Sequence, residues 1–405
     1  MTAQATAEET GAPTMAVGGR RRNLFLVANN LEEMGGLQRV AHNLAATFAA
    51  AGHNVELIGI MPHPSALSYA PGDTYRTTVL YGQPAPPTWR PRTLRDRLDL
   101  RSRRREHHRR RLRRAAVDRL SERFRSVPDG IVICTQAFAM DWVHEADTSH
   151  LRVITQSHES YEASRGLTPA SRGSARYTRM RRTYRDVDLF LLLTQHDADM
   201  FEREGFNNVG VLHNPLTMYP DRRSDLSAKT VINVSRYHEQ KNQRALIDAF
   251  ALVWRRHPDW RLQLVGEGPL QSALREQVDA LGLGAAVSVG GPTAEVQARL
   301  LASSIFAMSS DFEGLPLVLA EAMACGVPCV SFDCAPGIRE IIADGADGLV
   351  VPPRDTAALA GAICRLIEDA DLRQRMGAAA RWNIRRFAPV EILRQWHEVF
   401  DLVER

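Results

Sequence analysis

Lysine and long apolar runs are both scarce in this sequence of 405 residues. Arginine has replaced lysine nearly everywhere, and the only two lysines are Lys229 and Lys241. No apolar run approaches the roughly 18 residues that a membrane-spanning helix needs, which argues against a helical membrane protein. A lysine that is kept in so arginine-rich a chain is informative, because its ammonium is a more compact charge than a guanidinium.

Cysteines are few, and their spacing shows no pairs. An odd number without paired spacing indicates reduced thiols and a cytoplasmic protein. Three of them lie close together in residues 325–334, but that segment contains no histidine and is expected to form a helix end, a strand and a loop. We therefore expect no metal site. The five cysteines are Cys134, Cys325, Cys329, Cys334 and Cys364.

The length exceeds that of one usual hydrophobic core, so two domains are expected. Residues 1–22 are expected to be a disordered leader, since most of them are small, polar or charged. The arginines at 20–22 and the apolar run at 24–28 faintly resemble a signal peptide, but the run is too short and no cleavage site follows. We expect a first domain over residues 23–218, a second over 219–388 and a last helix over 389–405.

The positive charge is concentrated in one segment. Residues 90–114 contain 13 arginines and three acidic residues, a balance of +10, whereas the whole chain carries +4. A helix is expected over residues 92–120. This helix could simply be solvated, or it could bind anionic lipid or a lipid-phosphate acceptor. Binding to nucleic acid is a third alternative, which is disfavoured because no aromatic residues lie among the arginines. The candidate contacts are Arg103, Arg104, Arg105, Arg109, Arg110 and Arg111.

The first half begins with the pattern of a βαβ unit. A buried strand is predicted at residues 24–28, a loop at 29–36, a helix at 37–51 and a second strand at 55–60. This order predicts a parallel sheet in a doubly wound α/β domain. The loop lies where such sheets bind ligands, and its Gly35 and Gly36 would let the backbone approach a ligand closely. The alternative for the glycine pair is an ordinary helix start.

Residues 62–91 are rich in Pro, Gly, Ser and Thr, and an irregular excursion is expected there. Further strands are predicted at residues 130–135, 153–155, 189–193 and 209–212. The strand at 153–155 leads into the polar segment QSHES, which contains His158. An imidazole titrates near neutrality and can donate or accept a proton, so His158 is a candidate for function as well as for a structural role.

The second half repeats the alternation of strands and helices after a polar linker at residues 219–228. Strands are predicted at 230–234, 261–265, 287–289, 305–308 and 328–331. Arg236 and Lys241 follow the first of these strands, beside a helix start, and could bind phosphate or lie at the surface. Gly266 and Gly268 follow the second strand in a tight turn that a ligand could approach.

Residues 311–328 read DFEGLPLVLAEAMACGVP and predict a polar turn followed by a short apolar helix. Pro316 suits the first helical turn, and Gly326 suits the residue past the helix end. The free N–H groups of Gly314, Leu315 and Leu317 would then cluster at the positive end of the helix, where a phosphate binds readily.

Two glutamates flank this anion site. Glu313 precedes the helix and Glu321 lies inside it. A carboxylate accepts two hydrogen bonds and therefore suits paired sugar hydroxyls. The arrangement describes a pocket for a hexose, a pyrophosphate and a ribose; the alternative is a capped core helix with two surface glutamates.

Taken together, these motifs resemble the family 4 retaining glycosyltransferases with the GT-B fold. The resemblance extends from about residue 23 to residue 405 and is strongest in the second half. It rests on the two glutamates in FEGLPLVLAEAMACGVP, the cations of SRYHEQKN, the glycines of GGLQRV and the turn GEGP, in that family's order. It implies two Rossmann-like doubly wound parallel-sheet domains and transfer of a hexose or N-acetylhexosamine from a nucleotide sugar, with UDP expected.

The resemblance also implies roles for the residues. Arg236 and Lys241 would neutralise the donor diphosphate, while Glu313 would hold the transferred sugar and Glu321 the ribose. His158 would touch the sugar or the acceptor. Gly35, Gly36, Gly266 and Gly268 would line the donor site. Retention would follow from front-face attack assisted by the departing phosphate, without a side-chain nucleophile, a metal or another cofactor.

The sequence departs from the family pattern at the crossing HNPLT, in the setting of His158 and in the length of the arginine-rich segment. The expected partners are a nucleotide-sugar donor, a glycan, polymer or lipid-linked acceptor and an anionic membrane surface at the inner face of the plasma membrane, with no nucleic acid. A GT-B epimerase or phosphorylase and a nucleic-acid-binding protein are the alternative functions.

Overall fold

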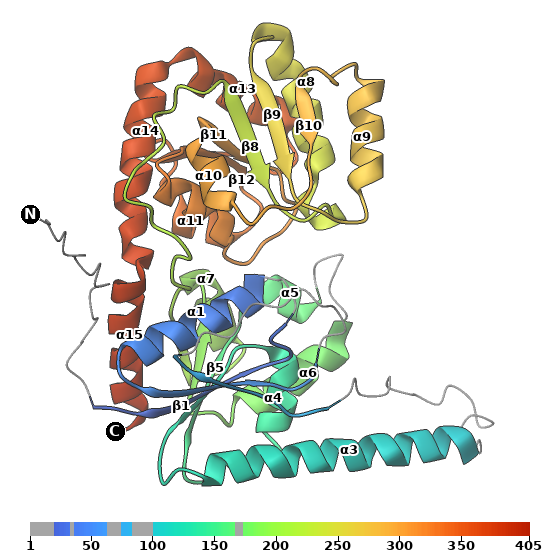
Figure 1. The fold of residues 1–405 in the computed structure, drawn as a ribbon, viewed down its shortest axis with the longest axis vertical. Coiled ribbons are helices and arrows are strands. Elements are labelled where there is room, and N and C mark those ends of the chain that lie inside the picture. Colours follow the sequence, from blue (N-terminus) through green and yellow to red (C-terminus); the bar gives the residue numbers. More distant parts are fainter. Residues whose placement is uncertain (1–19, 33–35, 63–73, 83–99, 167–172) are drawn as a thin grey trace, which may run out of the picture. The chain divides into compact units, whose positions relative to one another are not determined.

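The computed structural model describes residues 20–32, 36–62, 74–82, 100–166 and 173–405, without the side chains of residues 100, 102, 103 and 173–176. Its backbone forms two parallel β-sheets with helices packed against them (Figure 1). The two Rossmann-like parallel-sheet domains predicted from the sequence are confirmed. Residues 1–19, Gly35 and residues 90–99 of the arginine-rich segment lie outside the described residues.

The first sheet has seven strands in the order β3-β2-β1-β4-β5-β6-β7. The central strands β1 and β4 are apolar and almost wholly buried apart from the first residue of β1, Asn23, as expected for a parallel sheet that is covered on both faces. Its strands are β1 (Asn23–Ala28), β2 (Asn54–Gly59), β3 (Arg76–Val79), β4 (Ile131–Cys134), β5 (Arg152–Gln156), β6 (Leu189–Leu192) and β7 (Val209–Val211).

Helices connect these strands, and α3 differs from the others in its length and charge. The last turns of α3 bury Val117, Leu120 and Phe124, whereas its first turns extend beyond the body of the surrounding unit (Figure 1). The helices are α1 (Gly36–Ala50), α3 (Leu100–Arg125), α4 (Ala137–Val143), α5 (Tyr161–Arg165), α6 (Gly173–Tyr184) and α7 (Gln195–Arg203).

The second sheet has six strands in the order β10-β9-β8-β11-β12-β13. They are β8 (Thr230–Val234), β9 (Arg261–Val265), β10 (Val287–Val289), β11 (Ile305–Met308), β12 (Cys329–Phe332) and β13 (Gly348–Val351). A large apolar cluster joins this sheet to the helices α8 and α13, with Phe250 and Ile363 fully buried within it. Because the strands of this sheet pair in parallel, the carboxyl ends of β8, β9 and β11 share one edge.

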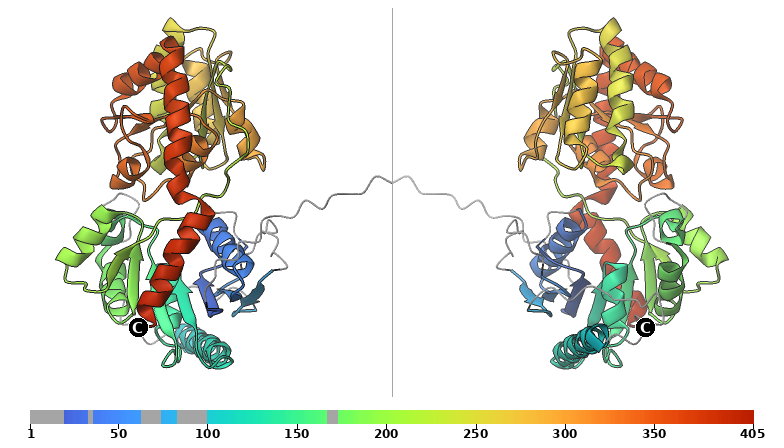
Figure 2. Two further views of the ribbon diagram at one scale, coloured as in Figure 1. Left: turned by 90° about the vertical axis from the view of Figure 1, so that its left-hand side faces the viewer. Right: turned by 90° about the vertical axis from the view of Figure 1, so that its right-hand side faces the viewer.

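The helical segments of the second half are η1 (Glu239–Lys241), α8 (Gln243–Arg256), α9 (Gln271–Ala280), α10 (Val296–Leu301), α11 (Leu317–Ala324), α12 (Pro336–Ile341), α13 (Thr356–Glu368), α14 (Ala370–Asn383), η2 (Ile384–Phe387) and α15 (Pro389–Val403). Helix α14 runs along the side of its unit (Figure 2). None of the helices in the described part of the chain combines the length and the apolarity required to cross a membrane.

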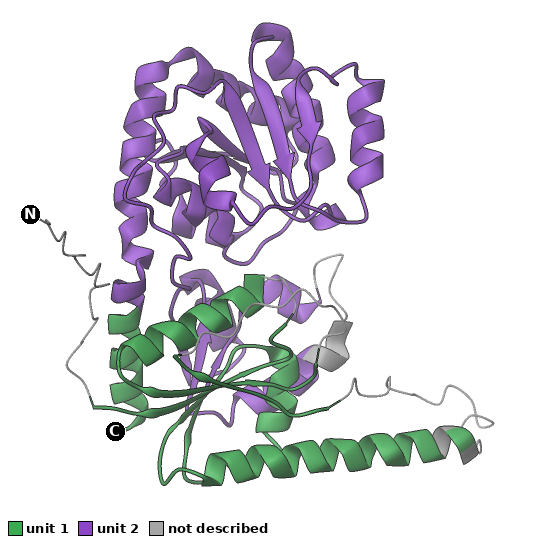
Figure 3. Ribbon diagram, viewed as in Figure 1, with its two compact units in different colours: residues 1–153, 393–405 green, residues 154–392 purple. Residues whose placement is uncertain are grey.

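The chain divides into two compact units, residues 1–153 with 393–405 and residues 154–392 (Figure 3). Within the first unit, the C-terminal helix packs on α1 through aromatic rings, with Trp396 and Phe48 centred 5.6 Å apart. Arg22 is buried there between the carboxylates of Asp401 and Glu404. The predicted limits of the domains remain predictions.

Several local expectations differ from the structure. Residues 76–79, which were expected to be irregular, form β3 because they pair in parallel with β2. Strand β13 was not anticipated. Helix α11 begins at Leu317, so that Pro316 caps the helix in an extended conformation rather than occupying its first turn. Gly326 follows the end of this helix with φ of 73°, as expected.

Candidate functional site

The loop between β11 and α11 is fastened to the loop between β8 and α8. The main-chain N–H of Asp311 donates to the carbonyl of Gln240 over 2.9 Å, and the amide of Gln240 donates back to the carbonyl of Phe312 over 3.0 Å. The Asp311 carboxylate accepts from the Asn242 amide over 2.9 Å and from two guanidinium nitrogens of Arg354, each at 3.1 Å. These contacts fix both loops at the carboxyl edge of the second sheet.

Lys241 and Glu313 meet across this pair of loops. The Nζ atom of Lys241 lies 2.6 Å from Oε1 of Glu313, and the two side chains are only 18% and 7% exposed. The second oxygen of Glu313 has no partner within the described residues. The pair therefore presents one ammonium, already oriented, and one carboxylate oxygen that is available to a ligand hydroxyl.

Arg236 provides a second cation on the same loop. Its side chain is exposed, and none of the residues that the structure describes forms an ion pair with it. The main-chain carbonyl of Arg236 accepts from the buried amide of Gln243 over 2.7 Å, which fixes the backbone while leaving the guanidinium free. An unpaired guanidinium beside a paired ammonium suits a ligand with more than one negative charge.

Gly266 and Gly268 allow the loop after β9 to touch the loop after β8. A Cβ atom on Gly266 would lie 2.0 Å from the carbonyl oxygen of Ser235, and one on Gly268 would lie 2.3 Å from that of Tyr237. The main-chain N–H of Tyr237 donates to the carbonyl of Glu267 over 2.8 Å. These two glycines therefore allow the loop after β9 to pack closely against the loop that carries Arg236 and Lys241.

The start of α11 presents main-chain N–H groups. Those of Gly314, Leu315 and Leu317 make no main-chain hydrogen bond to the described part of the chain. Leu315 is buried and Leu317 is half-buried. A Cβ atom on Gly337, in α12, would lie 2.0 Å from the carbonyl oxygen of Gly314, so α12 presses directly on this turn. The free N–H groups and the helix dipole favour an anion here.

Glu321 lies inside α11 and is 2% exposed. Its carboxylate accepts a short hydrogen bond from the hydroxyl of Thr217, in the segment after β7. This contact places Glu321 within reach of a polar segment that comes from the first half of the sequence.

His158 follows β5 and lies beside the same turn. Its carbonyl oxygen would be 2.7 Å from a Cβ atom on Gly314. Its Nδ1 atom is 3.2 Å from the amide nitrogen of Asn214, whereas its Nε2 atom is buried without a partner within the described residues. Burial lowers the pKa of His158 to about 4. When the Asn214 amide donates to Nδ1, a neutral ring holds its proton on Nε2 as an unsatisfied donor.

The remaining candidates lie in the first unit. Gly36 is the first residue of α1 and is exposed, with open space where a Cβ atom would be; Gly35 is outside the described residues. Arg109 is held by Glu106 through two contacts of 2.8 Å. Arg103 belongs to α3, but its side chain is outside the described part. The exposed arginines among the candidates are Arg104, Arg105, Arg110 and Arg111.

One group of side chains in the described residues could hold a metal ion. The ligand atoms of His257, Cys364 and Glu368 lie within 4.8 Å of one another. The group is at the far end of α8 from Lys241, about 20 Å away by the helical rise. Arg256 already pairs with Glu368 over 2.6 Å, and this guanidinium opposes a bound cation.

Sequence reasoning missed several residues that complete the site. Asn214 contacts His158, Thr217 contacts Glu321, and Arg354 holds Asp311. Arg354 has φ of 62°, a left-handed conformation that is uncommon outside glycine. The only available signal was the polar segment HNPLT after β7, which was interpreted as a turn out of the first domain.

Two family models match the chain over most of its length. The model described as Glycosyltransferase Family 4 matches residues 34–217, and the model described as Glycosyl transferases group 1 matches residues 220–382.

Two relatives and one solved structure give further comparisons. An exopolysaccharide phosphotransferase of Streptomyces coelicolor is 37% identical over 224 residues, which are 54% of this chain and 24% of that protein. The amylovoran biosynthesis glycosyltransferase AmsD of Erwinia amylovora is 30% identical over 219 residues, 52% of this chain and 61% of AmsD. The chain thus spans about a quarter of the first relative and about three fifths of the second.

The solved structure is that of a mutant of S. aureus TarM in complex with fondaparinux, alpha-GlcNAc-glycerol and UDP. It matches with a TM-score of 0.78 at 14% identity and covers 95% of this chain and 100% of that chain. At this level of identity the match concerns the fold.

Proposed function

Because this chain belongs to glycosyltransferase family 4 and has the GT-B fold, we propose that it transfers a hexose or N-acetylhexosamine from a nucleotide sugar to a glycan of the cell envelope. The proposed donor is a UDP-sugar, and the proposed acceptor is an exopolysaccharide, a teichoic-acid-like polymer or a lipid-linked saccharide. The names of the relatives and the ligands of TarM support these classes. The anomeric configuration of the sugar is retained.

The observation that carries the proposal is the Lys241–Glu313 pair beside the free N–H groups that precede α11. A diphosphate at this point would contact the Lys241 ammonium, the Arg236 guanidinium and the helix N-terminus. These groups stabilise the charge that develops as the nucleotide departs, and the Lys241 ammonium and the helix N-terminus are oriented before the reaction begins. The free oxygen of Glu313 accepts a hydroxyl of the transferred sugar, and Glu321 and Thr217 lie beside the ribose.

The proposed reaction breaks the bond between the anomeric carbon and the diphosphate oxygen and forms a bond from that carbon to the acceptor oxygen on the same face. The departing phosphate oxygen takes the proton of the acceptor hydroxyl. No side chain forms a covalent intermediate, and the cations make a metal ion unnecessary. The buried N–H of neutral His158 donates to the sugar or to the acceptor.

Four exposed arginines in the first half of α3, Arg104, Arg105, Arg110 and Arg111, give the proposal a location. Exposed guanidinium groups on a projecting helix suit an anionic surface. We assign them to the inner face of the plasma membrane or to an anionic acceptor, for a protein that acts in the cytoplasm, and we assign no nucleic acid to them.

A donor screen tests the function. Purified protein would be heated with UDP-, GDP- and ADP-sugars, because a bound donor raises the apparent melting temperature. The stabilising donor would then be incubated with and without a polymer acceptor, and NMR would establish the anomer of the product. Stabilisation by a UDP-sugar and acceptor-dependent product of retained configuration are expected. A changed sugar nucleotide formed without acceptor would indicate an epimerase, and an inverted product would refute the mechanism.

A further inference from the structure

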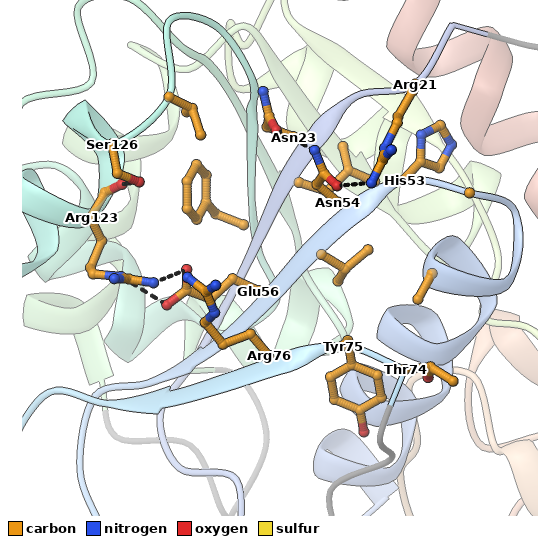
Figure 4. A pocket seen from close by; sticks show the side chains of 16 residues that line it. Arg21, Asn23, His53, Asn54, Glu56, Thr74, Tyr75, Arg76, Arg123 and Ser126 are labelled. Carbon is orange, nitrogen blue, oxygen red and sulfur yellow. Dashed lines mark hydrogen bonds and ion pairs between the residues drawn. The ribbon is translucent and has the colours of Figure 1, made fainter.

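A pocket of about 950 Å³ opens at the amino ends of strands β1, β2 and β3 in the first unit (Figure 4). The C-terminal ends of α1 and α3 complete its wall. Strand β1 spans Asn23–Ala28, so roughly 16 Å separate the pocket from the carboxyl edge, where the loop to Gly36 begins. The pocket is therefore distinct from the carboxyl edge of its own sheet, where Gly36 lies, and its size is in the range of about 300–1,000 Å³ that small ligands occupy.

The one carboxylate that lines the pocket is already engaged. Glu56 accepts from two guanidinium nitrogens of Arg123, at 3.0 and 2.7 Å, and from the hydroxyl of Thr78 at 2.6 Å. Arg76 lies opposite Glu56 in the register of β2 and β3 and is exposed. No ion pair involves Arg76 in the described residues, so its charge is available to a ligand.

A second available guanidinium lines the pocket. Arg21 donates a short hydrogen bond to the side-chain oxygen of Asn54, whose amide in turn donates to Asn23 over 2.9 Å. Arg21 has no carboxylate partner among the described residues. Figure 4 shows Arg21 with Asn54 on one side, and Arg123, Glu56 and Arg76 on the other. Both sides therefore contribute a cation to the lining of the same pocket.

Neutral polar groups and a ring complete the lining. Thr74 and Ser126 are exposed hydroxyl residues, and Tyr75 is half-buried with its hydroxyl 2.6 Å from Nδ1 of His42. Some of the last main-chain carbonyls of α1 and α3 accept hydrogen bonds from the turns that follow these helices. For example, the N–H of Ser126 donates to the carbonyl of Arg123 over 3.2 Å. These hydrogen bonds limit the negative potential at the helix ends. Hydroxyls, amides, a ring and separated cations match a ligand that carries both hydroxyls and negative groups.

We propose that this pocket is a second glycan-binding site, which takes a disaccharide-sized segment bearing phosphate, sulfate or carboxylate groups. Arg21 and Arg76 bind the anionic groups, and Asn23, Thr74 and Ser126 bind the hydroxyls. The identity of the ligand rests on the proposed function, because a growing acidic polymer held here would be retained between transfer events. The pocket itself takes no part in the transfer.

Calorimetric titration with a sulfated disaccharide derived from heparin tests the site. The protein is saturated with UDP beforehand, so that the donor site is already occupied. The variant Arg21→Gln/Arg76→Gln should bind at least tenfold more weakly than the wild type. The matched control Arg114→Gln/Arg119→Gln removes the same charge from two exposed arginines of the same unit outside the pocket and should stay within twofold. Thr74→Trp, which adds an indole to the pocket wall, should also weaken binding.

Equal losses in both double variants would show unspecific attraction and overturn the proposal, as would an unchanged affinity in the pocket variants. Inorganic phosphate that bound as tightly as the disaccharide would refute the saccharide assignment. Hydrolysis of the nucleotide sugar, measured in the same variants, separates the two proposals. Binding lost with hydrolysis intact supports the second site, whereas saccharide binding in a protein that processes no sugar nucleotide would refute the proposed function alone.

Discussion

Lys241 and Glu313 form an ion pair of 2.6 Å whose side chains are almost removed from solvent. Burying two charges costs several kcal/mol in desolvation, which their attraction only partly repays, so such a pair is weak evidence for stability. Its position, between two loops that are tied together by Gln240 and Asp311, indicates a different role. It holds an ammonium in a fixed place at the start of α11.

Replacing Glu313 with alanine should lower the turnover number for sugar transfer at least tenfold, or about 1.4 kcal/mol in the barrier. The substitution leaves the Lys241 ammonium half-buried without its partner and removes the acceptor for the sugar hydroxyl. Lys241→Ala should produce a loss of similar size. Steady-state kinetics would measure both variants, with circular dichroism to establish that they are folded.

Lys229 supplies the matched control for this experiment. It is the other lysine of the chain and pairs with Asp259 at the surface, where both side chains are more than half exposed. Exposed pairs contribute about 0–1 kcal/mol, so Lys229→Ala should leave transfer unchanged. Normal transfer in both Glu313→Ala and Lys241→Ala would contradict the assignment of the site.

Gly337→Ala should weaken binding of the nucleotide sugar, although the added methyl group would not contact the ligand. The added methyl group would lie 2.0 Å from the carbonyl oxygen of Gly314, so the turn that holds Glu313 has to move. Overpacking of this kind costs about 1–3 kcal/mol. We expect a lower melting temperature and a tenfold higher dissociation constant for UDP, measured by calorimetry.

The control for this variant is Gly361→Ala, in the exposed middle of α13, where a Cβ atom would meet nothing within 4 Å. Alanine is favoured over glycine in a helix by up to about 1 kcal/mol, so this variant should be as stable as the wild type or more so. A Gly337→Ala protein with unchanged UDP affinity would show that α12 does not position the turn.

The apolar pattern of the sequence was sufficient to predict most of the sheets. Residues 24–28 of β1 and the whole of β11 are continuous apolar runs because both of their faces are buried. Strand β3 was not predicted, because its sequence, RTTV, is mostly polar and the strand is largely exposed at the edge of the sheet. It is defined by pairing with β2, which a local pattern does not reveal.

The site was predictable only in part for a related reason. The spacing of Glu313 and Glu321 is local, and it identified the turn and helix that carry them. The contacts of Asn214 with His158 and of Thr217 with Glu321 join residues 56 and 104 positions apart. Single polar side chains leave no periodic signal, so their partners become apparent only when the chain is folded.

Acidification should destabilise the protein through His53. Its Nδ1 accepts from the N–H of Arg22, and its Nε2 lies 2.9 Å from Nε2 of His397. Burial, followed by the neighbouring His397 and Arg22, lowers the pKa of His53 from 6.5 to about 4. Between these values the unfolded chain binds a proton that the folded chain does not, so stability falls as the pH falls from 6.5 towards 4.

The expected contribution of His53 between pH 6.5 and pH 5 is about 2 kcal/mol, from 1.36 kcal/mol for each pH unit. Urea unfolding at pH 5, 6 and 7 would measure it. His53→Gln should flatten this dependence, although His158, whose pKa is also lowered to about 4, should still contribute. A variant with the same pH slope as the wild type would contradict the role of His53.

Neutralising the exposed arginines of α3 should separate surface binding from chemistry. The variant Arg104→Gln/Arg105→Gln/Arg110→Gln/Arg111→Gln removes four charges from turns of α3 that extend beyond their unit. Each basic residue near an anionic bilayer contributes about 1 kcal/mol, so binding to vesicles with anionic lipid should fall by two orders of magnitude or more in a sedimentation assay. Donor hydrolysis should be unchanged, because these residues lie outside the turn that holds Lys241 and Glu313.

Three comparisons make this prediction decisive. Vesicles of neutral lipid should bind neither protein, and raising the salt concentration should release the wild type from anionic vesicles, because exposed charges are screened within about 8 Å at 0.15 M salt. Duplex DNA provides the alternative polyanion. Tighter binding of the wild type to DNA than to anionic vesicles at equal salt would reject the lipid assignment, and equal loss of vesicle binding and donor hydrolysis in the variant would show that α3 supports the fold instead.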